Sequence, residues 1–249
     1  MPQLSVVIIT FNEEKNIARC LESIKGLADD IVVIDSFSTD NTQNICKQFQ
    51  VNFIQHAWEG YSNTKNYANS QAKFNWILSL DADEALSEEL KLSIEELKKS
   101  DKLNTAKFNR ITNYCGNWIK HGGWYPDTKI RLFDKTIAKW TGIIHEELSF
   151  SKQIDTLHLK GDCLHYSYYS IEQHYKQADT FTTIAAKDLY EQGKRSSYLK
   201  MIIGPVLKFI RDYFIKFGFM DGKAGLTVAR ISAYATYLKY KKLNDLHQS

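Results

Sequence analysis

Short runs of aliphatic and β-branched residues recur through the first hundred positions of this chain. The runs at Leu4–Thr10, Ile31–Asp35 and Asn75–Leu80 are almost continuously apolar, which is the pattern of strands buried on both faces. Val51–Gln55 predicts a further strand. Because segments with helical spacing separate these runs, the pattern predicts an α/β fold with a mainly parallel sheet. The chain has no internal repeat, which excludes solenoids and propellers.

The segments between the strands carry the signals of helices. Apolar residues recur at helical spacing after Asn12, which we expect to cap the first helix, and after Thr39 or Asp40, one of which we expect to cap the second. Tyr61–Ala72 predicts a third helix, and Ser87 is expected to open a fourth.

The pattern changes in the second half of the chain. Residues 107–163 mix short strands with a loop rich in glycine and aromatic residues. Beyond Tyr168 the chain is expected to be helical, with interruptions at Pro205 and in the Gly218–Gly225 region. A boundary between a catalytic body and a helical tail is predicted near Gly193.

Charge is distributed unevenly across that boundary. The net charge is +3, but residues 194–249 carry 11 Lys/Arg against three Asp/Glu, whereas the preceding residues have a balance of −5. Basic helices with large aliphatic and aromatic residues favour an anionic membrane surface over nucleic acid, with packing on the body or homo-oligomerisation as alternatives. We therefore divide the chain into a catalytic domain, 1–193, with halves 1–100 and 101–193, and a basic amphipathic helical tail, 194–249.

Composition is that of a globular protein, with 249 residues of which 43% are hydrophobic and 24% charged. The four cysteines lie far apart and form no CxxC pair, which favours a reducing compartment over a disulfide framework. The chain shows neither a signal-peptide pattern at its N-terminus nor an apolar run long enough to span a membrane. We expect a cytoplasmic protein on the inner face of the cytoplasmic membrane.

The predicted strands end in polar residues, and in open α/β sheets ligands bind at those ends. The chain contains neither GxGxxG nor GxxxxGK, so another feature must balance the charge of any bound nucleotide diphosphate. Asp81 and Asp83 follow a buried strand, and two such carboxylates can hold a divalent cation that binds phosphate oxygens. Asp35 is expected to contact a base or ribose, with capping of its own turn as the alternative.

Several segments together resemble the inverting glycosyltransferases of family 2, which have the GT-A fold. Later segments are similar to bacterial enzymes that add glucose to the first heptose of the lipopolysaccharide inner core. The resemblance covers nearly the whole chain. It is carried by SVVIITFNEEKNIARCLESI, VVIDSFSTDNT, GYSNTKNYA, LSLDADE, IKHGGWYPDTKIRLF, IIHEEL and GDCLHYSY.

The resemblance implies a donor site for a UDP-sugar and a Mg²⁺ or Mn²⁺ ion. Many relatives have a second aspartate where this chain has Ser36, which leaves the recognition of uracil open. The resemblance matches Asp81 and Asp83 to the metal and ribose carboxylates, with Asp83 as the direct metal ligand, and places Lys65 near the diphosphate. The nucleotide site that it implies consists of Thr10, Asn12, Glu13, Asp35, Ser36, Lys65 and Asp81.

An inverting transfer needs a base that deprotonates the acceptor hydroxyl. The resemblance implies Glu146 in the segment His145-Glu146-Glu147, and Glu147 and Asp127 remain alternatives. The segment is not HExxH, so a zinc peptidase is not supported. His165 is interpreted as a core histidine rather than a metal ligand.

The glycine- and aromatic-rich loop is interpreted as the acceptor site. Aromatic rings beside a carboxylate suit a sugar, which has apolar faces flanked by hydroxyls. Paired glycines allow close backbone approach, and a packed turn with core aromatics is the alternative. The expected acceptor residues are Gly123, Trp124, Tyr125 and Asp127, with Arg131 anchoring the loop or contacting anionic substrate.

The resemblance thus implies transfer of glucose from UDP-glucose, with inversion, to a heptose of the lipopolysaccharide core. Alternatives are a family 2 enzyme with another donor sugar or a polyprenyl-phosphate acceptor, and a non-catalytic membrane-binding protein on the same fold. Glucose and galactose differ at one hydroxyl, and no residue pattern separates them.

Overall fold

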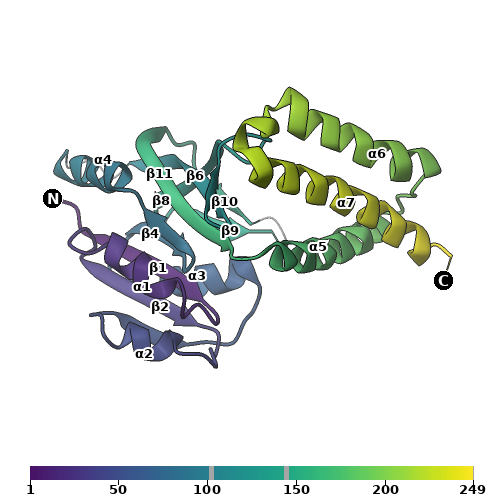
Figure 1. Cartoon of the computed structure of the whole chain (residues 1–249). Helices are drawn as coiled ribbons and strands as arrows, with labels where there is room; N and C mark the ends of the chain where they lie inside the picture. Colours follow the sequence, from purple (N-terminus) through teal and green to yellow (C-terminus); the bar gives the residue numbers. More distant parts are fainter. Residues whose placement is uncertain (101–103, 143–145, 249) are drawn as a thin grey trace. The chain divides into compact units, whose positions relative to one another are not determined.

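The apolar runs form the centre of a mainly parallel sheet, which confirms the predicted fold class (Figure 1). The computed structural model describes residues 1–100, 104–142 and 146–248. β1 (Leu4–Thr10) lies between β2 (Asp30–Asp35) and β4 (Trp76–Asp81) and is parallel to both, and β3 (Asn52–Gln55) extends the sheet beyond β2. All seven residues of β1 are buried, as expected for a strand covered on both faces.

The second half of the chain completes the sheet with antiparallel pairs. The order among the described residues is β3-β2-β1-β4-β8-β6-β11-β5, with β7 paired to β6, while β9 and β10 form a separate hairpin. These strands are β5 (Glu84–Leu86), β6 (Thr105–Tyr114), β7 (Asn117–Ile119), β8 (Asp127–Asp134), β9 (Ala138–Thr141), β10 (Glu147–Phe150) and β11 (Thr156–Tyr168).

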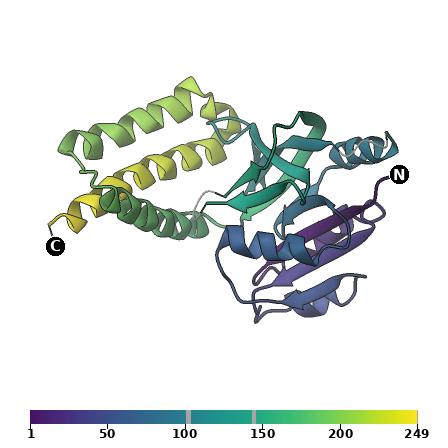
Figure 2. The same cartoon turned by 180° about the vertical axis from the view of Figure 1, so that it is seen from behind.

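Successive residues of β1 face two different layers, because side chains alternate along a strand. Val6 and Ile8 belong to the apolar cluster formed with α1, α2 and α4. Val7 and Ile9 belong to the cluster on the opposite face, where α3 and β9 cover the sheet (Figure 2). The helices are α1 (Ile17–Ser23), α2 (Thr42–Cys46), α3 (Tyr61–Gln71) and α4 (Glu88–Lys99).

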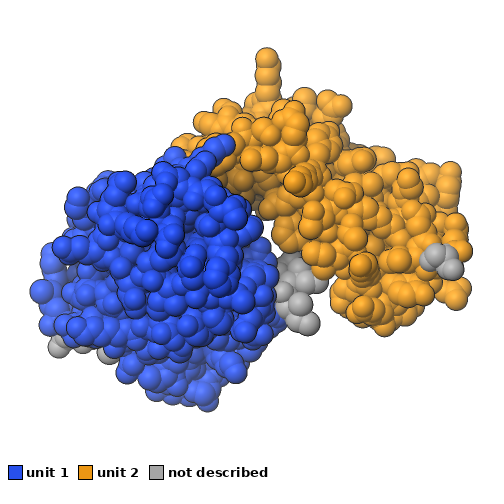
Figure 3. Space-filling model, turned by 90° about the horizontal axis from the view of Figure 1, so that it is seen from below, with its two compact units in different colours: residues 1–110, 127–165 blue, residues 111–126, 166–249 orange. Residues whose placement is uncertain are grey.

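The chain divides into two compact units that differ from the predicted domains (Figure 3). Unit 1 contains residues 1–110 and 127–165, and unit 2 contains residues 111–126 and 166–249. The predicted boundary near Gly193 falls inside unit 2, because α5 packs along α7. Unit 2 contains α5 (Ile171–Glu191), α6 (Tyr198–Ile210), the short helical turns η1 (Arg211–Ile215) and η2 (Gly218–Asp221), and α7 (Gly222–Leu246).

Two local predictions are wrong and one is confirmed. α1 begins after Asn16, and Asn12 instead accepts a hydrogen bond from the backbone N–H of Thr39 at 2.8 Å. Pro205 lies inside α6 without ending it, because a proline removes only one intrahelical hydrogen bond and the helix keeps its packing on α7. Ser87 caps α4 as expected, accepting a hydrogen bond from the N–H of Leu90.

None of the helices among the described residues is long and apolar enough to cross a bilayer. All four cysteines are free thiols.

Gly161 is expected to be one of the least replaceable residues of unit 1. A Cβ at this position would lie 2.3 Å from the backbone nitrogen of Leu90, and its φ is +86°. Gly161→Ala should lower the free energy of unfolding by at least about 3 kcal/mol, measured by urea denaturation. Gly26→Ala is the control, because φ is +78° there but a Cβ would meet no atom of another described residue, its chain neighbours apart, within 4 Å, and it should cost about 1 kcal/mol. Equal losses would contradict the close packing of β11 on α4.

Candidate functional site

The strand pairing brings the predicted strand-end residues to one edge of the sheet. Thr10 is directly opposite Asp35, and Ile9 is opposite Asp81. Thr10 is buried, and its hydroxyl has no hydrogen-bond partner among the described residues. The carboxyl ends of β1, β2 and β4 therefore converge as the sequence predicts.

Lys65 extends from α3 to this edge. Its side chain is only 2% exposed, and its Nζ lies 3.0 Å from Asp81 Oδ1 and 2.9 Å from Glu146 Oε1. A buried ammonium requires such partners, because an unpaired charge in the interior is strongly unfavourable. Lys65 thus joins the strand-end aspartate to the carboxylate expected to act as base.

Two arginines continue the chain of ion pairs. Arg131 Nη2 lies 2.9 Å from Asp81 Oδ2 and 3.0 Å from Glu84 Oε1, and Arg110 Nη1 lies 3.2 Å from the same oxygen of Glu84. Arg110 also donates from Nε and Nη2 to Asp127 Oδ2, at 2.9 and 2.7 Å. We refer to this arrangement as the ion-pair chain: Glu146, Lys65, Asp81, Arg131, Glu84, Arg110, Asp127 and Lys129.

Arg131 differs from its predicted role in the acceptor site. It is 4% exposed, and its guanidinium is engaged with Asp81 and Glu84 rather than with the acceptor loop. Arg110 and the buried carboxylate of Glu84 were not predicted as site residues. Glu84 is visible in the sequence as the last acidic residue of LSLDADE, whereas no local pattern marks Arg110.

The Lys and Arg side chains of the ion-pair chain keep Asp81 and Asp127 ionised. Burial raises the pKa of Asp81, but Lys65 and Arg131 more than offset this, and the net pKa is well below the ordinary value. Burial likewise raises the pKa of Asp127, and the nearby Arg110 and Lys129 bring it below its usual range. A carboxylate with a lowered pKa is a poor proton acceptor, which weakens the case for Asp127 as base.

Asp83 and His165 provide a donor set suited to a metal ion, although the sequence pattern favours a core histidine over a ligand at position 165. His165 Nε2 lies 3.1 Å from Asp83 Oδ2, because β11 places His165 directly opposite Glu84 of β5. The carboxylate of Asp83 suits Mg²⁺ or Mn²⁺, which prefer oxygen ligands, and the imidazole of His165 adds a nitrogen ligand of the kind that transition-metal ions such as Mn²⁺ accept. The oxygens of Asp81 face Lys65 and Arg131 instead. No cluster of three or more potential protein ligands occurs among the described residues.

Asp35 has the turn-capping arrangement that was the alternative to nucleotide contact. It is fully buried, and its carboxylate accepts hydrogen bonds from the backbone N–H of Ser38 at 3.0 Å and from the Ser38 hydroxyl. The Ser36 N–H donates to the carbonyl of Thr10 at 3.0 Å. Together with the Asn12–Thr39 bond, these contacts tie the loops after β1 and β2 to each other.

Glu13 lies in the polar segment after β1 and has a pKa above that of an ordinary glutamate. Its backbone N–H donates to Thr42 Oγ1 at 2.9 Å, and its carboxylate accepts from Asn16 Nδ2 at 2.7 Å. Burial is the main cause that raises the pKa of Glu13 to about 7. The hydrogen bond from Asn16 lowers this pKa, and repulsion from Asp83 and Asp40 raises it further.

The loop predicted to bind the acceptor runs from His121 to Asp127 and is in part a packed turn. We call its part in unit 2, together with Lys120, the 120–126 loop. Gly123 is exposed, and Tyr125 is joined to Pro126 by a cis peptide bond. Trp124 is half-buried, as the alternative reading predicts, and its ring packs at centroid distances of 6.0, 5.8 and 5.5 Å against Tyr114, Tyr168 and His174.

The two adjacent glutamates lie in different environments. Glu146 is half-buried and paired with Lys65, whereas Glu147 is exposed at the start of β10, where its backbone pairs with that of Thr141. His145, which precedes them, lies outside the described residues.

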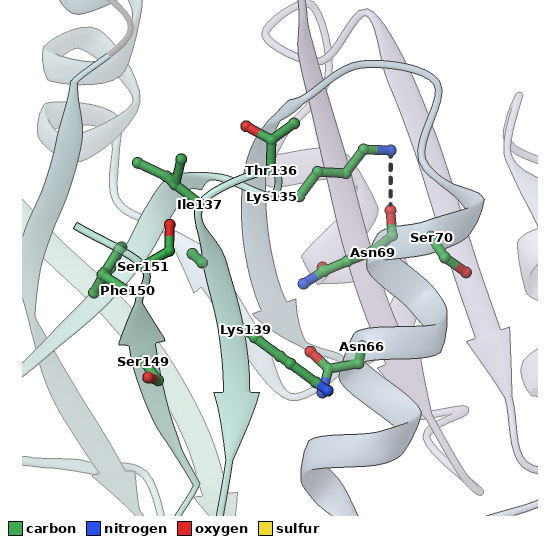
Figure 4. Close-up of a pocket in the computed structure, with 11 residues that line it drawn as sticks. Asn66, Asn69, Ser70, Lys135, Thr136, Ile137, Lys139, Ser149, Phe150 and Ser151 are labelled. Carbon is green, nitrogen blue, oxygen red and sulfur yellow. Dashed lines mark hydrogen bonds between the residues drawn. The ribbon is translucent and has the colours of Figure 1, made fainter.

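A separate groove of about 490 Å³ lies between α3 and the β9–β10 hairpin (Figure 4). Lys135 crosses one end of it and donates to the carbonyl of Asn69 at 3.2 Å. None of the residues that line it is a predicted site residue. They are Asn66, Asn69, Ser70, Lys135, Thr136, Ile137, Ala138, Lys139, Ser149, Phe150 and Ser151.

The sheet and the charged strand-end edge define the class of protein as a nucleotide-sugar transferase of the GT-A fold. The model of glycosyl transferase family 2 matches residues 5–174, and the chain belongs to this family of glycosyltransferases.

Relatives match over almost the whole chain. An uncharacterized glycosyltransferase of Rickettsia typhi is 34% identical over 99% of this chain and 88% of its own length. The lipopolysaccharide core biosynthesis glycosyltransferase LpsC of Rhizobium meliloti is 26% identical over 98% of this chain and 93% of its own. Among solved structures, Staphylococcus aureus TarS in complex with UDP-GlcNAc matches with a TM-score of 0.45, at 15% identity over 99% of this chain and 91% of that chain.

The raised pKa of Glu13 predicts a pH-dependent stability. Because folded Glu13 binds its proton more tightly than the unfolded chain does, stability falls as pH rises from about 4.5 to about 7, and the loss is complete above that range. Glu13→Gln should therefore be more stable than the wild type near pH 8, by on the order of 2 kcal/mol, with little difference near pH 5.

Thermal and urea unfolding at the two pH values would measure this effect. Glu14→Gln, at the exposed neighbouring carboxylate, is the control and should show no such gain. A Glu13→Gln protein without added stability at high pH would contradict the raised pKa.

Proposed function

We propose that this glycosyltransferase transfers glucose from UDP-glucose, with inversion, to a heptose of the lipopolysaccharide inner core. The observation that carries the proposal is the ion-pair chain, which joins Glu146 and Asp81 through Lys65 at the carboxyl edge of the sheet. The role of the Rhizobium meliloti relative LpsC in lipopolysaccharide core biosynthesis supports the acceptor class. The choice of glucose rests on the resemblance stated for the sequence.

Glu146 acts as the base in this proposal. It accepts the proton of the acceptor hydroxyl while that oxygen forms a bond to the anomeric carbon of the donor. The bond from that carbon to the diphosphate oxygen breaks, and UDP leaves with the bonding electron pair. Lys65 holds the carboxylate of Glu146 in place from 2.9 Å and keeps a positive charge beside the departing diphosphate.

Asp83 and His165 would hold the Mg²⁺ or Mn²⁺ ion. A bound divalent cation supplies positive charge to the diphosphate oxygens of the leaving group. Asp81 is better suited to orienting Lys65 and Arg131, since both of its oxygens face those cations. Thr10, Asn12, Glu13 and Ser36 complete the proposed donor site, and Asp35 supports it by fixing the turn after β2.

The acceptor is proposed to be borne by lipid, so the enzyme works at the inner face of the cytoplasmic membrane as a peripheral protein. Gly123 and Tyr125 remain the proposed contacts for its sugar. Of the alternative bases, Asp127 is held by two cations, Arg110 and Lys129, whereas among the described residues Glu146 pairs with Lys65 alone, and Glu147 is exposed. Glu146 is therefore the stronger candidate.

Release of UDP from a panel of UDP-sugars tests the reaction. With heptose-containing core lipid as acceptor, we expect release from UDP-glucose that depends on both acceptor and Mn²⁺. Asp83→Ala should lose the metal-dependent release while keeping the wild-type melting temperature, because Asp83 is partly exposed and takes no part in the ion-pair chain.

Other outcomes of the panel separate the alternatives. Release from a different UDP-sugar would replace glucose, and release with polyprenyl phosphate alone would replace the acceptor. UDP binding by calorimetry without any release would favour a non-catalytic protein. Wild-type release by Asp83→Ala would contradict the metal assignment.

Glu146→Gln tests the base. We expect kcat to fall by about a hundredfold or more, with UDP binding retained, because glutamine keeps the shape but cannot accept the proton. Glu147→Gln is the matched control in the adjacent residue and should keep kcat within a small factor of the wild type. If only Glu147→Gln or Asp127→Asn lost activity, the base would be reassigned to that residue.

A further inference from the structure

α6 presents an apolar surface that the described protein does not cover. The helix contains no buried residue. Its apolar side chains are exposed in a band that fills about half of the helix circumference at 3.6 residues per turn. The band consists of Leu199, Ile202, Ile203, Val206, Leu207 and Ile210, with exposed fractions between 41% and 66%.

The packing of α6 on α7 uses the opposite side of the helix. A Cβ at Gly204 would lie 3.6 Å from the methyl carbon of Thr236 in α7, so the helices approach closely there. α7 itself lies between α5 and α6 (Figures 1 and 2). Of the two basic helical segments of the tail, it is therefore α6 whose apolar residues remain in contact with solvent.

The turn after α6 extends the apolar surface. Ile215, Phe217 and Met220 are 66%, 55% and 61% exposed. Phe217 has a φ of +56° in the left-handed region, which is uncommon for an aromatic residue, and its ring packs edge-on against that of Phe219 at a centroid distance of 6.1 Å. Large exposed apolar patches on soluble proteins mark interaction sites. We call the band on α6 together with this turn the α6 surface.

The charge near the α6 surface favours an anionic partner. Residues 194–249 carry a balance of +8, and exposed Lys200 and Arg211 border the band. A second copy of the chain would bring two positively charged surfaces together, whereas anionic lipid headgroups are complementary to both the charge and the apolar residues.

The same turn holds the 120–126 loop within unit 2. Asp221, whose side chain is 7% exposed, accepts hydrogen bonds from the backbone N–H groups of Lys120 and His121 at 3.1 and 2.8 Å. Its other oxygen lies 2.8 Å from His121 Nδ1. The Gly122 N–H donates to the carbonyl of Lys216 at 2.8 Å. The loop and the apolar turn are therefore one connected piece of structure.

We propose that the α6 surface binds the anionic leaflet of a membrane, and that Asp221 holds the 120–126 loop against the bound surface. This rests on the proposed function in that the loop would receive a sugar carried by a membrane lipid. Asp221 is a positioning residue, since its contacts are with the loop.

Flotation with vesicles tests the surface without requiring turnover or UDP. Wild-type protein should bind vesicles of phosphatidylcholine and phosphatidylglycerol mixed equally, and bind phosphatidylcholine alone far less. The triple variant Leu199→Gln/Ile203→Gln/Leu207→Gln should lose at least about tenfold in binding. Leu92→Gln is the matched control, because Leu92 is 57% exposed on α4 of unit 1, and it should bind as the wild type does.

A second variant covers the case in which the triple variant fails to fold. Phe217→Asn is compatible with the left-handed backbone and should also weaken binding by about tenfold. Unchanged binding by a folded variant, or no binding by the wild type, would overturn the proposal. A wild-type dimer in sedimentation that the variants abolish, without vesicle binding, would assign the surface to a second copy.

Hydrogen exchange tests the role of Asp221. The amides of His121 and Gly122 should exchange more slowly when the wild type is bound to the mixed vesicles, because their hydrogen bonds lie on the docked turn. Asp221→Asn should still bind vesicles but lose that added protection, whereas the control Asp245→Asn should retain it. Exchange at these amides that does not respond to vesicles would overturn the link between surface and loop. These outcomes are independent of UDP release, so failure of the proposed reaction is recognised separately.

Discussion

The side chain of Glu84 is fully excluded from solvent, so its negative charge has to be neutralised within the protein. Arg110 and Arg131 meet at the same carboxylate oxygen, and the second oxygen accepts the backbone N–H of Asp81 at 3.0 Å. Removing one partner of such a buried group typically costs about 3–5 kcal/mol. Glu84 therefore fixes the backbone of Asp81 and the guanidinium that neutralises it, and the position of Lys65 and Glu146 follows from Asp81.

The ion-pair chain is electrically balanced, with four carboxylates and four cations. A nucleotide diphosphate that enters such a site brings negative charge. The ion-pair chain has no surplus positive charge to neutralise it. Asp83 lies outside the chain and faces His165, which is the arrangement in which an additional divalent cation is best accommodated. The balance thus supports a division of roles in which Asp81 organises the cations of the protein and Asp83 holds the metal.

Features of the fold and of the candidate site could be predicted from the sequence where they depend on contacts between residues close together in the chain. β1 begins and ends where its apolar run does, and Ser87 caps α4. Both features depend on residues that are adjacent or nearly adjacent in the sequence, so the sequence pattern is enough to predict them. Asn12 and Arg131 were assigned differently, since their partners are 27 and 50 positions away in the chain. Arg110 was not predicted for the same reason, because its partners are distant in the sequence. Lys65 and Glu146 were predicted only from the resemblance to family 2 enzymes, since the sequence does not show that they pair with each other.

In the helical tail, the sequence pattern does not predict which apolar helix face is exposed, because this depends on how the helices pack. Two segments of the tail combine basic residues with large apolar ones, and by sequence either is suited to lipid. In the structure α7 lies between α5 and α6, and its residue Val228 is buried against Tyr114 and Ile119, whereas no residue of α6 is buried. An apolar band left uncovered beside a positively charged segment is unfavourable in water and favourable on an anionic bilayer. Asp221 ties the loop to the end of that band, so the proposed docking would also restrict where an acceptor sugar is presented to the loop.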